Sequence, residues 1–218
     1  MSFDRIVISS GHGKYVRGAS GVLDEVDEAR KVVEHVADEL RARDVEVTTY
    51  HDDVSQSQNE NLNRIVDFHN SNQRDLDVSV HFNAYVETDN PMGTEVLFVT
   101  QPALAGEMSA AIADAGNLID RGAKKRTDLF FLNNTEMPAI LIETCFVDSS
   151  ADADAYQQQF DAICEAIASV LGGAEEVTDP PPGEIEPPVR PDKPTPTLRL
   201  DVEVTGEVTI IINGVPVA

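Results

Sequence analysis

The stretch Val7–Gly21, "VISSGHGKYVRGASG", joins a run of branched aliphatic residues to a loop that places a histidine between two glycines. Branched aliphatic residues are typical of a buried strand. A glycine on each side of His12 allows tight turns and lets another group approach closely. A ligand site needs such a loop, and so does any tight connection between a strand and a helix. The role of His12 therefore depends on what the rest of the chain brings to this loop.

Outward from this stretch, the chain alternates predicted strands and helices as far as Gly173. Apolar residues at helical spacing or in short β-rich runs define each element. Helices are predicted at 22–44, 59–72, 103–119 and 152–171, and strands at 3–9, 45–50, 76–82, 94–99 and 138–144. This alternation predicts an α/β fold, in which helices cover both faces of a mixed, mainly parallel sheet.

The composition changes sharply after Gly173. Residues 174–197 contain most of the chain's twelve prolines and indicate a stiff, acidic linker. Residues 198–218 alternate apolar and polar side chains around Thr-Gly and Asn-Gly turn signals, which predicts a small β-hairpin. So short a tail cannot bury a core alone, and we expect it to pack against another copy, the main domain or a surface. The predicted organisation is a main domain at 1–173, a linker at 174–197 and a β tail at 198–218.

The composition limits the partners and the compartment. The chain has 39 acidic and 16 basic residues among 218, a formal net charge of -23, which argues against nucleic acid and anionic membranes as general partners. Two cysteines, Cys145 and Cys164, cannot form a disulfide framework and are expected to be buried as small apolar residues. The N-terminal residues lack the pattern of a signal peptide, and no stretch approaches a membrane span. We therefore expect the protein to begin in a cytoplasm.

Three reactive side chains follow predicted strands. His12 follows the first strand, His81 ends the strand at 76–82, and Glu143 ends the strand at 138–144. The carboxyl ends of parallel strands meet at one edge of a sheet, where ligands bind in open α/β folds. These three side chains are therefore expected to lie close together.

Two histidines and one carboxylate form a standard ligand set for a catalytic zinc ion, which keeps a fourth position open. The carboxylate could be Glu25 or Glu28. Helical geometry places Glu25 in line with Ala29 and Val32, on the edge of the buried stripe, and it places Glu28 on the polar side. A buried carboxylate needs a partner or a metal, and we therefore prefer Glu25 as the ligand and interpret Glu28 as solvated.

Glu143 supplies a second carboxylate, which can take a proton from a zinc-activated water and return it to a leaving amine. Taken alone, His12 is also compatible with a plain turn and His81 with a buried core histidine. Side chains two residues apart on a strand point to the same face, so Cys145 is expected on the face of Glu143. A Cys–His nucleophile is therefore a second, weaker hypothesis. The remaining histidines are interpreted as surface residues: His35, His51 and His69.

The main domain resembles the zinc-dependent N-acetylmuramoyl-L-alanine amidases of bacterial autolysins and phage endolysins. Four segments carry the resemblance in the family's order: "IVISSGHGK", "GVLDEVDEARKVVEHVADEL", "VSVHFNAY" and "MPAILIETCFVDSSAD". The resemblance implies that one Zn²⁺ per chain is held by His12, Glu25 and His81, and that Glu143 is the general base. It also implies cleavage of the amide between N-acetylmuramic acid and L-alanine of the stem peptide, with peptidoglycan as the partner.

Substrate contacts are less clearly marked. Asn83 follows the second histidine and is a candidate for positioning substrate. The basic stretch of Lys124, Lys125 and Arg126 is a candidate for contact with a substrate carboxylate or the scissile carbonyl, although a solvated basic turn would have the same sequence. The first loop reads "GHGK" where the family often has a second glycine, so local substrate contacts are expected to differ.

Several roles fit the resemblance. A phage endolysin would accumulate in the host bacterial cytoplasm without a signal peptide and act on the wall after release, whereas an autolytic or sporulation amidase would look similar. The same residues are also compatible with a zinc peptidase that cuts within the stem peptide, or with a wall-binding module whose site has decayed. For the β tail, wall binding and homo-oligomer formation by strand addition are both open, and strand addition is slightly favoured.

Overall fold

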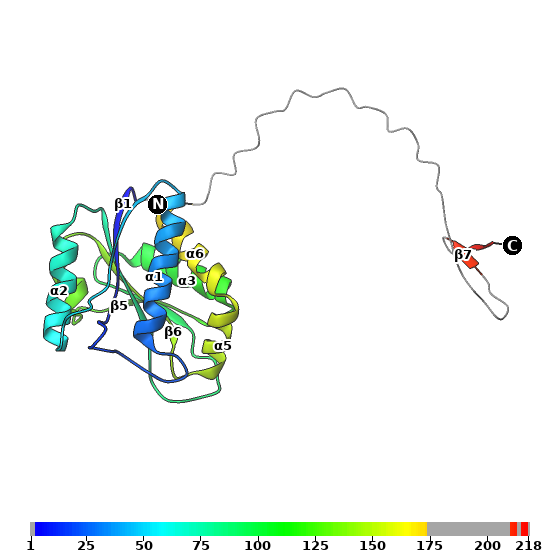
Figure 1. Cartoon of the computed structure of the whole chain (residues 1–218), viewed down its shortest axis with the longest axis horizontal. Helices are drawn as coiled ribbons and strands as arrows, with labels where there is room; N and C mark the ends of the chain where they lie inside the picture. The colour runs from blue at the N-terminus through cyan, green and yellow to red at the C-terminus, as the bar shows by residue number, and fades with distance from the viewer. Residues whose placement is uncertain (1–2, 174–209, 213–214, 218) are drawn as a thin grey trace, which may run out of the picture. The chain divides into compact units, whose positions relative to one another are not determined.

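The computed structural model describes residues 3–173, 210–212 and 215–217. They belong to two units, Met1–Glu176 and Val177–Ala218 (Figure 1). The strands of the first unit are β1 (Arg5–Ser10), β2 (Glu46–Tyr50), β3 (Leu76–Asn83), β4 (Thr94–Phe98), β5 (Asp120–Lys125) and β6 (Ala139–Phe146). Its helices are α1 (Glu25–Ala42), α2 (Gln58–Ser71), α3 (Pro102–Gly116), α4 (Phe130–Asn134), α5 (Ser150–Gln158) and α6 (Phe160–Gly172).

The six strands form one sheet in the order β2-β1-β3-β6-β4-β5. All neighbouring strands pair in parallel except β4 and β6, which are antiparallel. Helices cover both faces: α1, α3 and α6 pack together on one side, and α2 and α4 lie on the other (Figure 1). The predicted α/β fold with a mixed, mainly parallel sheet is therefore confirmed.

The two faces of the sheet bury two separate apolar cores. The larger core lies beneath α1, α3 and α6 and includes Ile140 and Ile142 of β6. The smaller core lies beneath α2 and α4 and includes Leu141, the β6 residue between Ile140 and Ile142 in the sequence. Because successive strand residues point to opposite faces, a strand buried on both sides carries a continuous apolar run, as residues 139–142 of β6 do.

Four local features differ from the sequence prediction. The helix predicted from Val22 begins at Glu25, because Asp24 caps it by accepting the N–H of Asp27. The helix predicted at 152–171 is interrupted at Gln159, which separates α5 from α6. Strand β5 and the five-residue helix α4 were not predicted, because a polar edge strand and a single helical turn carry little periodic signal.

The second unit contains a short antiparallel pair, β7 (Ile210–Ile212) and β8 (Val215–Val217). This pair agrees with the predicted β-hairpin. The predicted linker at 174–197 and residues 198–209 of the predicted β tail lie outside the described residues. Among the described residues, we find no helix with the length and apolar character needed to cross a membrane.

The interpretation of His69 as a surface residue was wrong. Its side chain is fully buried between the sheet and α4, where the ring packs edge-on against Phe131. Nδ1 lies 2.8 Å from Asp77 Oδ1, and Nε2 lies 2.9 Å from Ser9 Oγ. A neutral imidazole satisfies both contacts, with Nδ1–H donating to Asp77 and Nε2 accepting from the Ser9 hydroxyl. This side chain therefore ties α2 to β1 and β3.

His69 makes the stability of the fold depend on pH. Burial lowers the pKa of His69 below its usual 6.5, although Asp77 opposes the shift. The unfolded chain therefore binds this proton more readily, and the contribution of His69 to stability falls as the pH drops below about 6.5. We expect the difference in unfolding free energy between wild type and His69→Gln to shrink from about pH 7.5 to about pH 5. Urea unfolding at both pH values measures it, and a difference that widens on acidification would contradict this prediction.

Candidate active site

Three predicted ligands come together at the carboxyl ends of β1 and β3. His12 lies in the loop after β1, Glu25 is the first residue of α1, and His81 belongs to β3. One ligand atom from each residue lies within 4.8 Å of the others. The two imidazole rings meet edge-on, with centroids 5.0 Å apart. Two imidazole nitrogens and one carboxylate oxygen are a donor set that fits zinc.

Glu25 is the centre of this cluster and is only 3% exposed. Its Oε1 lies 2.9 Å from His81 Nδ1 and 3.5 Å from His12 Nε2, and Oε2 accepts the N–H of Ala19 at 2.6 Å. Burial alone would raise the pKa of Glu25, but the hydrogen bond and charge of His81, with the charge of His12, outweigh it and lower the pKa to about 2. The carboxylate is therefore ionised at neutral pH, as a metal ligand must be.

Glu28, the second candidate for the carboxylate ligand, lies outside the cluster. It is not simply solvated, because its side chain is only 15% exposed. Oε2 accepts a hydrogen bond from the Tyr156 hydroxyl at 3.1 Å, and Oε1 pairs with Lys31 at 2.8 Å. Glu28 therefore joins α1 to α5.

Two glycines let the loops close around these side chains. A Cβ atom on Gly11 would lie 1.7 Å from His81 Nε2, and a Cβ on Gly18 would lie 2.0 Å from Glu25 Oε2. Real Cβ contacts are never that short, so any other residue would displace the imidazole or the carboxylate. The glycines of the first loop are therefore needed for close approach.

Gly11→Ala is expected to lower the zinc affinity of the protein at least tenfold, because the new methyl group occupies the space of the His81 ring. Gly106→Ala in α3 is the matched control, since nothing lies within 4 Å of its Cβ position. Titration calorimetry with zinc measures both variants. Equal affinity in Gly11→Ala and wild type would contradict the prediction.

Glu143 lies on β6 directly beside His81 of β3. Burial raises the pKa of Glu143 to about 7. The negative charges of Glu25 and Glu95 also raise this pKa, whereas the charges of His81 and Arg126 lower it. Its Oε2 is buried and has no hydrogen-bond partner among the described residues. A carboxyl group with a free oxygen and a pKa near neutrality is suited to accept a proton and return it.

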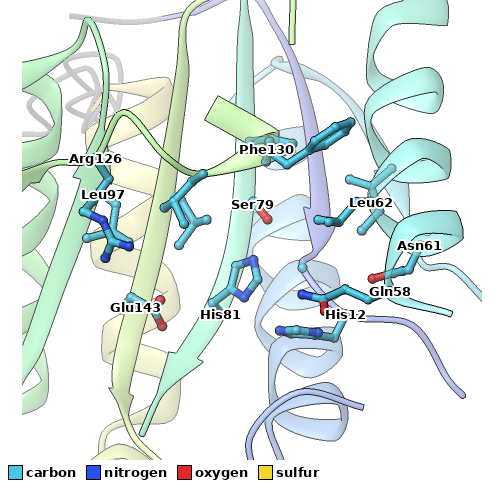
Figure 2. Close-up of a pocket in the computed structure, with 15 residues that line it drawn as sticks. His12, Gln58, Asn61, Leu62, Ser79, His81, Leu97, Arg126, Phe130 and Glu143 are labelled. Carbon is cyan, nitrogen blue, oxygen red and sulfur yellow. The ribbon is translucent and has the colours of Figure 1, made fainter. Parts of the chain in front are cut away.

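A cavity of about 320 Å³ begins at His12, His81 and Glu143 and continues between the sheet and helices α2 and α4 (Figure 2). The walls away from the cluster are mostly apolar: Leu62, Ile65, Leu97, Leu129, Phe130, Phe131 and Leu141. Sequence reasoning missed the contributions of α2 and α4. No motif marks them, because apolar residues that line a cavity have the same pattern as residues that fill a core.

Arg126 lines the cavity, and its guanidinium forms two hydrogen bonds with Asp128 at 2.9 and 2.8 Å. Lys124 and Lys125 are exposed at the end of edge strand β5, and neither lines this cavity. Asn83 also lies outside it, and its amide donates to Glu95 Oε1 at 3.1 Å. The structure thus brings only Arg126 of these substrate-contact candidates into the cavity.

The geometry does not support a Cys–His nucleophile. The pairing of β3 and β6 shifts register after Glu143, and this irregularity turns Cys145 into the larger core on the opposite face. Burial raises the pKa of the Cys145 thiol well above its usual value, which disfavours the reactive thiolate. Both cysteines are free and buried, as predicted.

Comparison with known proteins agrees with this geometry. A family model described as N-acetylmuramoyl-L-alanine amidase matches residues 6–172. An uncharacterized 38.4 kDa protein of Clostridium perfringens is 34% identical over 164 residues, which cover 71% of this chain and 46% of that protein. The N-acetylmuramoyl-L-alanine amidase LytC of Bacillus subtilis is 28% identical over 163 residues, which cover 71% of this chain and 32% of LytC. The chain thus spans half or less of the length of these two relatives.

Solved structures share the fold. The catalytic domain of the CD27L endolysin, which targets Clostridium difficile, superposes with a TM-score of 0.70 at 25% identity, covering 77% of this chain and 96% of that one. The amidase AmiC2 of Nostoc punctiforme superposes with a TM-score of 0.66 at 25% identity, and the match covers 77% of this chain and 94% of the AmiC2 chain. The chain belongs to the N-acetylmuramoyl-L-alanine amidase family.

Proposed function

We propose that this protein is a zinc-dependent peptidoglycan hydrolase that cleaves the amide between N-acetylmuramic acid and L-alanine of the stem peptide. The observation that carries the proposal is the convergence of His12, Glu25 and His81 within 4.8 Å, beside a Glu143 oxygen that has no partner among the described residues. Membership of the amidase family supports the choice of substrate.

In this proposal His12, Glu25 and His81 hold one Zn²⁺, which supplies Lewis-acid activation of water and of the scissile carbonyl. Glu143 takes the proton from the attacking water through its free oxygen and later donates it to the leaving amine of L-alanine. Its pKa of about 7 suits both steps at neutral pH. The apolar cavity walls exclude bulk water from the reacting groups.

Arg126 is proposed to bind a carboxylate of the stem peptide, because it is the cation that lines the cavity in the part of the chain that the structure describes. The Arg126 side chain is 44% exposed and its pairing with Asp128 is open to solvent, so exchange of Asp128 for a substrate carboxylate costs little. Lys125 and Asn83 lie outside this cavity and are weaker candidates for contact with the peptide.

Digestion of purified peptidoglycan with mass analysis of the soluble products tests the proposal. Free stem peptides that begin with L-alanine are expected, with activity lost in chelator and restored by zinc. Fragments cut inside the peptide would indicate a zinc peptidase instead. No release, together with intact wall binding, would overturn the enzyme proposal in favour of a wall-binding module.

We further propose that the enzyme acts as a phage endolysin, which reaches the wall from the host cytoplasm during lysis. Similarity to the catalytic domain of the CD27L endolysin supports this role, whereas similarity to LytC, an amidase of Bacillus subtilis, keeps an autolytic or sporulation amidase as the competing role. Expression in a bacterial cytoplasm, with and without a membrane-permeabilising holin, separates the two. Lysis that requires the holin supports the endolysin.

For residues 198–218 we propose homo-oligomer formation by strand pairing, and wall binding is the competing role. The antiparallel pair of β7 and β8 supports strand pairing, since two short strands leave edges that another copy can extend. Deletion of 174–218 followed by measurement of solution mass and wall binding separates the two roles.

A further inference from the structure

A second hollow, of about 450 Å³, shares no lining residue with the cavity described above. One wall is the segment 20–22 and the opposite wall is the segment 85–87, with Asp148 between them. Tyr85 also lines a neighbouring hollow together with Asn83. Neither hollow has a part in the mechanism proposed so far.

The walls of this hollow continue the three segments that build the catalytic site. Segment 20–22 follows Ala19, which donates to Glu25, and Tyr85 lies four residues after His81. Asp148 follows the strand that carries Glu143. Four residues span at most about 14 Å, so the Cα atom of Tyr85 lies within about 14 Å of the Cα atom of His81.

The loop that presents Tyr85 is held firmly. The backbone N–H of Tyr85 donates to Asp148 Oδ2 at 2.7 Å, and the N–H of Thr88 donates to the Asp148 carbonyl at 2.9 Å. The opposite wall is tied to the same turn, where Val22 N–H donates to the Val147 carbonyl at 2.7 Å. The tyrosine nevertheless remains 79% exposed. An exposed aromatic ring on a fixed backbone is a preorganised contact surface.

The side chains of the hollow match a sugar. Val22 and Val86, both 54% exposed, extend the apolar surface of Tyr85. Aromatic faces pack against the C–H faces of pyranose rings, whose hydroxyl groups can donate to acceptors such as Ser20, Glu87 and Asp148.

The charges that line this hollow differ from those that line the cavity, and we use the difference to assign the two parts of the substrate. The lining of this hollow contains two carboxylates, from Glu87 and Asp148, and no cation among the described residues. It therefore repels the carboxylates of a stem peptide and accepts an uncharged glycan. Arg126 lines the cavity on the α2 side and offers the opposite charge.

We propose that the hollow between segments 20–22 and 85–87 is a saccharide subsite, in which Tyr85 stacks on an N-acetylated sugar of the glycan strand. This inference rests on the proposed function for the identity of the polymer. It assigns the glycan to the Tyr85 side of the ligand cluster and the peptide to the Arg126 side.

Titration of the full chain with an N-acetylglucosamine tetramer, followed by NMR, tests the subsite without any hydrolysis. Wild type is expected to bind the saccharide saturably, Tyr85→Phe within about threefold of wild type, and Tyr85→Leu about tenfold more weakly. Tyr15→Leu is the matched control, because Tyr15 is another exposed tyrosine, at 55%, that does not line the hollow. Absence of saccharide binding by wild type, or equal affinity in Tyr85→Leu and wild type, would overturn the proposal.

The two proposals fail in different ways. If wild type releases stem peptides from peptidoglycan but binds no saccharide, the subsite is wrong and the amidase activity stands. If wild type binds the tetramer through Tyr85 but releases nothing, the subsite stands and the hydrolase proposal is wrong. Tyr85→Leu should also lower kcat/KM about tenfold on a multi-sugar muropeptide, and leave it unchanged on a muramoyl peptide with a single sugar.

Discussion

Glu143→Gln is expected to lower kcat for amide hydrolysis by about 10²–10⁴-fold, the usual range for loss of a general acid–base group. Glutamine keeps the size of the side chain but cannot take a proton from water. The change removes a carboxyl whose Oε2 has no partner among the described residues, so little native hydrogen bonding is lost. Steady-state release of stem peptides from peptidoglycan measures the effect.

Zinc affinity and thermal stability separate this chemical role from a structural one. Both are expected to stay close to wild type in Glu143→Gln, because Glu143 lies outside the cluster formed by His12, Glu25 and His81. Glu107→Gln is the control for a neutral substitution, since Glu107 is exposed on α3, on the opposite face of the sheet. A kcat within a few-fold of wild type would show that Glu143 is not the general base.

His81→Ala is expected to lower zinc affinity by more than about 100-fold, because loss of a direct ligand exceeds the 10–100-fold cost typical of an outer contact. It also leaves the buried Glu25 carboxylate without its closest side-chain partner, at 2.9 Å. Zinc titration by calorimetry measures the affinity, and the rise in Tm on addition of zinc gives a second readout. The rise in Tm should be present in wild type and absent in His81→Ala.

His35→Ala is the matched control, because His35 lies on α1 outside the ligand cluster and packs edge-on against Phe160. It should bind zinc with the affinity of wild type. A stoichiometry of one zinc per chain that persists in His81→Ala would show that the metal is held elsewhere. Comparison of His81→Ala and His35→Ala with Glu143→Gln distinguishes loss of the metal from loss of the proton carrier.

The sheet and the ligand cluster were accessible from the sequence for a physical reason. Strand and helix periodicity is local, and the rule that carboxyl ends of parallel strands meet needs no coordinates. That rule predicted that His12, His81 and Glu143 lie close together. The pattern of buried residues along α1 favoured Glu25 over Glu28 as the carboxylate ligand. In the structure, one ligand atom each from His12, Glu25 and His81 lie within 4.8 Å of one another.

Other features depend on contacts between segments far apart in the chain. His69 has the sequence context of a surface residue, yet packing of α2 on the sheet buries it against Asp77 and Ser9. Cys145 should share a face with Glu143 by simple alternation, but the register shift between β3 and β6 reverses it. Neither outcome has a local signal, because each is set by how one element docks on another.

The sequence alone determined the α/β class and the order of its main elements, and it predicted the four residues of the proposed catalytic centre. Only the tertiary structure decided the pKa of Glu143, the cavity between the sheet and the helices α2 and α4, and the exposed position of Tyr85. Periodicity records which side of an element is buried. Electrostatic environment and cavity shape arise from the summed positions of many groups, which the chain brings together only when it folds.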